Sequence, residues 1–142
     1  MRTEDLDALI QEVMRRITEG DTSVLHKLRS QFESATITKI DFDGYGFYAY
    51  MAPSEKLRIR NKKMQAFEIS DVVGFNDDGR PSVGFILFVR DGLICMLEGF
   101  PFLEDAWPSE EINFKYGIQP PMSDAAYSDT RYLDASTGIP ES

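Results

Sequence analysis

The stretch V-G-F-I-L-F-V-R-D-G-L-I-C-M-L-E-G-F, residues 83–100, decides the fold of this chain. Two apolar runs suited to β-strands flank the dipeptide Asp91-Gly92. Asp-Gly between such runs favours a two-residue type I′ turn, in which both central residues take positive φ, so the stretch predicts a β-hairpin. Residues 85–89 are apolar on both faces of the first strand. A strand of that kind needs cover on both sides, and we therefore place the hairpin in the centre of a sheet.

The chain before the first strand predicts two helices. Over residues 4–19, apolar side chains recur at three- and four-residue spacing and acidic side chains occupy the first turn. A second helix is expected after a capping residue, either Asp21 or Thr22. Its inner face is expected to carry Leu25, Leu28 and Phe32. Helices grouped before strands are typical of an α+β fold, here two N-terminal helices packed on an antiparallel sheet of about four to six strands.

The remaining strands are predicted from alternating patterns. Residues 36–42 and 47–51 predict two strands joined by a glycine-containing turn. A third strand is expected over residues 64–73. Basic and apolar residues alternate over residues 56–60, which predicts a strand at the sheet edge that its charge protects from pairing.

Regular patterning fades after Phe100, where prolines become frequent. We predict one α+β domain over residues 1–119 and an extended or partly mobile tail over residues 120–142. The helices are expected to cover one face of the sheet. The other face needs cover either from the C-terminal segment, in a monomer, or from a second copy, in a homodimer, and the sequence leaves both open.

The composition restricts the class of partner. The 142 residues carry a formal net charge of −9, which argues against nucleic-acid binding because phosphate backbones attract clustered Lys and Arg. A basic protein partner suits this charge, and solubility alone is the alternative explanation. The sequence has neither the apolar core of a signal peptide nor the run of about 20 apolar residues that spans a membrane. We expect a cytoplasmic protein that binds no membrane.

Few residues suggest catalysis. His26 is the only histidine and Cys95 the only cysteine, which leaves zinc sites, Ser-His-Asp triads and Cys-His dyads without their partner residues. We expect no metal and no other cofactor, and we assign no catalytic residue.

Glu98 is the unusual carboxylate because it stands inside an apolar run. Simple alternation places it on the same strand face as Ile94 and Met96. If that face is covered, burial raises the pKa of Glu98. The residue then suits either a structural role, through bonds to backbone amides, or a pocket in a small-ligand-binding domain or a hydrolase.

Aromatic residues are the candidate contacts for a partner, because Tyr and Trp dominate interface hot spots. Tyr48 and Tyr50 fall on the opposite face of their strand from Phe47, which we expect in the core. The predicted partner-binding residues are Tyr45, Tyr48, Tyr50 and Trp107.

Residues 84–102, G-F-I-L-F-V-R-D-G-L-I-C-M-L-E-G-F-P-F, are followed by Ala106-Trp107-Pro108. Together with D-G-Y-G-F-Y at residues 43–48, this pattern resembles a loosely defined set of small, uncharacterised bacterial proteins, some of which look like toxin-neutralising immunity proteins. The resemblance implies a binding role and supplies no catalytic residues to carry over. Together with the net charge of −9 and the missing catalytic sets, it favours a non-enzymatic acidic binding protein that neutralises a basic toxin domain. A small-ligand-binding domain or hydrolase that uses Glu98 is one alternative, and a homodimeric structural module is another.

Overall fold

The computed structural model of the protein describes residues 3–76, 78–102, 107 and 115–118. These residues form two N-terminal helices and an antiparallel sheet of seven strands, which confirms the predicted α+β fold with one strand more than expected. The helices are α1 (Thr3–Ile17) and α2 (Ser23–Ser34). The strands are β1 (Thr36–Phe42), β2 (Phe47–Ala52), β3 (Ala66–Ile69), β4 (Val72–Phe75), β5 (Pro81–Arg90), β6 (Leu93–Pro101) and β7 (Lys115–Ile118). The short 3-10 helices η1 (Glu55–Leu57) and η2 (Lys62–Met64) lie between β2 and β3.

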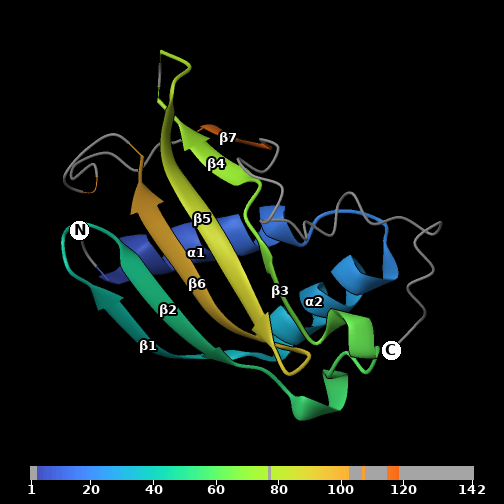
Figure 1. Ribbon diagram of the computed structural model, residues 1–142. Coiled ribbons are helices and arrows are strands. Elements are labelled where there is room, and N and C mark those ends of the chain that lie inside the picture. Colours follow the sequence, from blue (N-terminus) through green and yellow to red (C-terminus); the bar gives the residue numbers. More distant parts are fainter. Residues whose placement is uncertain (1–2, 77, 103–106, 108–114, 119–142) are drawn as a thin grey trace.

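The predicted hairpin is the centre of the sheet (Figure 1). The strand order is β1-β2-β6-β5-β4-β7, and β3 pairs with the other half of β5. Asp91 and Gly92 have φ of 56° and 74° at the turn between β5 and β6, as a type I′ turn requires. The tight turn sets the register, in which Leu87 pairs with Leu97. Both side chains consequently enter the core, where each is fully buried.

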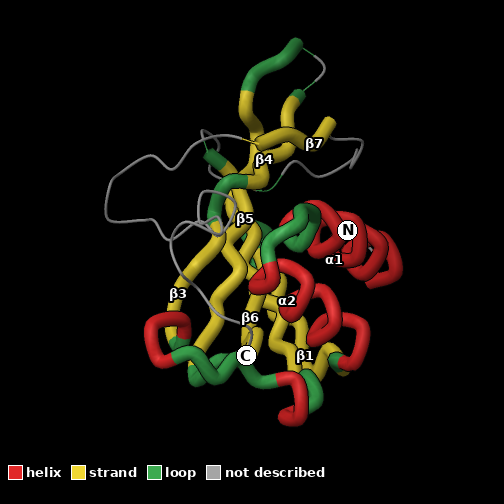
Figure 2. Tube along the Cα trace, turned by 90° about the vertical axis from the view of Figure 1, so that its right-hand side faces the viewer, coloured by secondary structure: helices red, strands yellow, loops and turns green. Residues whose placement is uncertain are grey.

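Both helices pack on the same face of the sheet (Figure 2). The predicted apolar stripe of α1 includes three fully buried side chains, those of Ile10, Val13 and Ile17, and Met14 is fully buried beside them. Thr22, one of the two expected caps, begins α2 by accepting a hydrogen bond from the Leu25 backbone amide at 3.1 Å. Burial of each large apolar side chain contributes about 1.5–3 kcal/mol, so packing on the sheet outweighs intrinsic propensity in stabilising the helices.

A buried polar residue, Gln31, joins α2 to the central hairpin. Its side-chain amide donates to the carbonyl oxygens of Leu57 and Gly92, both at 2.9 Å. Its side-chain oxygen accepts from the backbone N–H of Ile94 at 2.8 Å. Gln31 is fully buried, whereas Phe32, the residue expected on the inner face, is half-buried. The inner face of α2 therefore includes one amide that fixes the turn end of β5 and β6 to the helix.

A bulge in β6 overturns the simple alternation expected around Glu98. The ladder between β5 and β6 shifts register after the pair Phe88–Met96 and leaves Cys95 as the extra residue. Ile94 therefore faces the core and is fully buried. Glu98 keeps Met96 on its own face but not Ile94, so the prediction that all three share a face is wrong.

Residues 56–60 do not form the predicted edge strand. Ser54 and Asn61 cap η1 and η2, because each side chain accepts a hydrogen bond from a backbone amide of the turn that follows. Ile59 is buried between these turns, and its backbone N–H donates to the Gly92 carbonyl at 2.9 Å. The segment therefore packs against the hairpin turn, and its alternation reflects one fully buried residue among basic residues that are exposed or half-buried.

The single strand predicted over residues 64–73 is divided into β3 and β4. Ser70 and Asp71 separate the two strands, and each strand pairs with a different half of β5. No pattern in the sequence predicted β7, which pairs with β4.

The predicted tail over residues 120–142 lies outside the described residues. Neither α1 nor α2 has the length and apolar character that crossing a membrane requires.

The hairpin turn provides a stability test. A Cβ atom at Gly92 would lie too close to the Ile59 carbonyl oxygen, whereas one at Gly79 would meet no atom within 4 Å. Both glycines have positive φ, so both substitutions carry the same backbone strain. We expect Gly79→Ala to lower the free energy of unfolding by about 1 kcal/mol, and Gly92→Ala to lower it by about 2 kcal/mol more through the clash. Urea unfolding followed by circular dichroism measures both, and equal losses would contradict the described approach of Ile59 to the turn.

Candidate functional site

The face of the sheet opposite the helices is turned toward the viewer in Figure 1. This face carries a partly exposed aromatic and apolar surface. We call it the open face. It is defined by Tyr48, Tyr50, Ile86, Phe88, Met96, Glu98 and Phe100. Glu98 pairs with Tyr48 on one side and Ile86 on the other, and directly opposed residues share a face. Tyr48 and Tyr50 are 38% and 37% exposed, and the other five are half-buried. A contiguous apolar patch of this kind is typical of an interaction site.

Glu98 lies in the middle of the open face. Burial raises the pKa of its carboxyl group, while a hydrogen bond from the Tyr48 hydroxyl acts in the opposite direction. The charge of Glu98, together with burial, in turn raises the pKa of Tyr48, so the phenol keeps the proton that it donates. A carboxylate whose charge is disfavoured by burial gains from contact with a cation.

Two ion pairs border the open face. Lys39 Nζ lies 3.5 Å from Asp41 Oδ2 on β1. On the opposite side, Arg90 Nη2 lies 2.9 Å from Glu68 Oε2. Each pair is partly exposed and balances its own charge, so neither contributes net charge to the surface between them.

The Tyr48 side of the open face has negative character. Asp43, in the turn between β1 and β2, accepts hydrogen bonds at 2.9 Å from the backbone N–H groups of Tyr45 and Gly46. These bonds lower the pKa of Asp43 and keep it ionised. The charges of Glu98 and Asp43 both raise the pKa of Tyr48. This end of the surface therefore favours positively charged groups.

The structure brings only part of the predicted contact set together. Tyr48 and Tyr50 lie on the open face, opposite the fully buried Phe47, as predicted. Tyr45 lies in the turn between β1 and β2 and is 51% exposed. Whether these tyrosines bind a partner stays a prediction.

Trp107 does not lie on the surface as a partner contact would, because it is a core residue. The indole is 3% exposed, and it packs edge-on against Phe47 and Phe85 with ring centroids 5.6 and 6.3 Å away. Its backbone N–H donates to the Gly44 carbonyl at 2.8 Å. The aromatic cluster on the helix-covered face therefore explains this residue, and we remove it from the candidate contacts.

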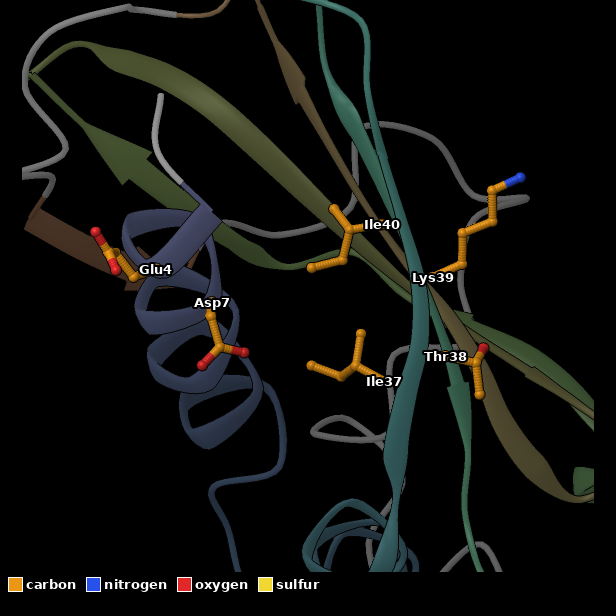
Figure 3. A pocket seen from close by; sticks show the side chains of 6 residues that line it. All are labelled: Glu4, Asp7, Ile37, Thr38, Lys39 and Ile40. Carbon is orange, nitrogen blue, oxygen red and sulfur yellow. The ribbon is translucent and has the colours of Figure 1, made fainter.

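A groove of about 600 Å³ lies at the β1 edge of the sheet, on the helix-covered side. Figure 3 shows Ile37 and Ile40 pointing from β1 toward α1, whereas Lys39 points to the other side of the strand. Glu4 and Asp7 of α1 also line this groove. Glu98 does not, so the most unusual carboxylate and the groove belong to different surfaces.

The described residues contain no group of three or more His, Cys, Asp and Glu side chains arranged to hold a metal ion. His26 is exposed on α2. Cys95 is half-buried at the bulge, with its thiol 3.5 Å from the Phe88 carbonyl, and burial raises the pKa of that thiol. A protonated, half-buried thiol is a poor nucleophile.

No family model, curated protein or solved structure matches this chain.

Proposed function

We propose that this protein is a non-enzymatic acidic binding protein that neutralises a basic toxin domain in bacteria, and that the open face receives this partner. The observation that carries the proposal is Glu98, a half-buried carboxylate among tyrosines and apolar side chains in the middle of that face. Such a site favours a Lys or Arg of the partner, which contacts the tyrosine rings and binds the carboxylate. The net charge of −9 adds long-range attraction toward a cationic surface.

Glu98 is also a candidate acid for a hydrolase or a small-ligand pocket. Its neighbours across the ladder are Tyr48 and Ile86, and it does not line the groove between α1 and β1. General acid–base catalysis requires a concave site that holds a substrate against the acid. A partly exposed sheet face suits a protein surface better, so we favour binding over catalysis.

Reversing the charge of Glu98 tests the proposal. We expect the protein to form a complex at physiological salt with the product of a neighbouring toxin-like gene, measured by isothermal titration calorimetry. Glu98→Lys should weaken that complex about 100-fold, because it places a cation against the cation of the partner at a partly desolvated position. Circular dichroism checks that the variant remains folded.

Glu33→Lys is the matched control, since it makes the same charge change at an exposed position on α2. We expect it to weaken the complex only slightly, because an exposed charge away from the open face acts mainly on the rate of encounter. Equal weakening by both variants would mean that net charge alone drives binding, and absence of a complex would oppose the proposal directly. Light scattering of the protein alone examines the homodimer alternative, which predicts a dimer that Glu98→Lys disrupts.

A further inference from the structure

A second surface, separate from the open face, lies along the outer edge of the sheet. β1 ends the strand order, and among the described strands it pairs with β2 alone. The outer side of such a strand presents backbone N–H and C=O groups that the sheet does not use. These groups are a template for an additional strand.

The register shows which residues present those groups. Along an antiparallel ladder, hydrogen-bonded and non-hydrogen-bonded pairs alternate. The Asp43 N–H donates to the Gly46 carbonyl at 3.2 Å, so Asp43 and Gly46 form a hydrogen-bonded pair at the turn. Counted back from this pair along the register, Ile40 and Phe42 are in non-hydrogen-bonded pairs with β2. Their backbone N–H and C=O groups therefore point to the outer edge.

The same strand forms the apolar wall of the groove. The register of β1 shifts between Ile37 and Lys39, and this bulge turns both Ile37 and Ile40 toward α1 (Figure 3). Phe42 pairs with the core residue Phe47 and so shares this side of the sheet, yet it remains 37% exposed. An apolar strip thus runs beside the outer backbone edge of β1, which no other described strand pairs with.

The facing wall of the groove is acidic. Glu4 and Asp7, in the first two turns of α1, line it and are exposed. Lys39 also lines the groove, but its side chain points to the other side of β1, where it pairs with Asp41 (Figure 3). The side of the groove that faces α1 therefore combines an apolar strip with carboxylates, which favours a partner with apolar and cationic side chains.

We propose that the outer edge of β1 and the groove beside it bind an extended peptide segment of another protein, which adds to the sheet as a strand. The backbone of the segment pairs with Ile40 and Phe42. An apolar residue of the segment contacts Ile37 and Ile40, and a Lys or Arg two positions away, on the same side of the added strand, reaches Asp7. This site is distinct from the open face, and it stands whether or not a toxin domain binds there.

A short fluorescent peptide tests this site. The probe has valine at its centre, lysine two residues away on each side, and threonine elsewhere. The backbone amides of an extended peptide alternate between its two edges and so form two sets. One further peptide carries N-methyl groups on the first set, and another carries them on the second set. Because an added strand directs only one set of amides to β1, one methylated peptide should bind like the parent in fluorescence anisotropy. The other should lose about tenfold or more in affinity, which corresponds to about 1.4 kcal/mol.

Matched protein variants locate the peptide. Asp7→Lys should weaken binding about fivefold because it reverses a charge in the groove, whereas Asp21→Lys makes the same change at an exposed position outside it and should leave binding unchanged. The proposal is overturned if the parent peptide does not bind saturably, if both methylated peptides bind equally well, or if the two variants weaken binding equally. A dimer in light scattering that the peptide dissociates would assign the edge to a second copy of the chain and would also overturn it.

Discussion

Trp107→Ala is expected to lower the free energy of unfolding by about 4 kcal/mol, among the largest losses for a single substitution in this chain. The indole fills the space beside Phe47 and Phe85 on the helix-covered face, and both of these rings are buried. Removing it leaves a cavity next to two large aromatic side chains, which a packed core cannot fill by relaxation. Urea unfolding followed by far-ultraviolet circular dichroism measures the loss without relying on tryptophan fluorescence.

Phe102→Ala is the control for this substitution. Phe102 also follows β6 and contacts Phe100 edge-on at 5.4 Å, but its side chain is exposed. We expect a loss of about 1 kcal/mol, typical of an aromatic pair at a surface. If Trp107→Ala costs no more than Phe102→Ala, the indole does not belong to the core, and Trp107 returns to the candidate contact residues.

Gln31→Leu is expected to lower the free energy of unfolding by about 3–4 kcal/mol. The substitution keeps the side chain similar in size but removes the partners of the Leu57 carbonyl and the Ile94 N–H. Each buried backbone group left without a partner costs about 1–3 kcal/mol. The loss of Gln31 costs less at the Gly92 carbonyl, because this oxygen still accepts a hydrogen bond from the Ile59 N–H at 2.9 Å.

Gln11→Leu makes the same chemical change at an exposed position on α1, and we expect it to change stability by less than about 0.5 kcal/mol. Amide hydrogen exchange gives a second readout. In Gln31→Leu, the Ile94 amide should exchange faster relative to the other amides of β6, because it has lost its acceptor. A loss no greater than that of Gln11→Leu, with Ile94 still protected, would show that Gln31 is not the link between α2 and the hairpin.

The two proposed binding surfaces, the open face and the groove beside β1, differ in how far the sequence predicted them. Tyr48 and Tyr50 were placed on the face opposite Phe47 by simple alternation, and alternation is reliable in β2 because its ladder with β6 is regular. The groove beside β1 was not predicted. It depends on the bulge that turns Ile37 and Ile40 to one side, and on the position of α1, which no local pattern encodes.

The sequence by itself determined the features whose causes lie within a few residues. These are the turn at Asp91-Gly92, the apolar stripe of α1, a start of α2 at either Asp21 or Thr22, and the order of helices before strands. Each follows from a backbone preference or from a periodicity of apolar side chains, and both act locally.

Only the tertiary structure decided the features that join distant segments. Gln31 reaches residues 57, 92 and 94, Trp107 packs on Phe47 and Phe85, and Ile59 bonds to the hairpin turn in place of an edge strand. The bulge at Cys95, which places Ile94 on the face opposite Glu98, is set by pairing with β5. A buried polar or aromatic group takes the position where partners from elsewhere in the chain satisfy it, and a local pattern does not specify those partners.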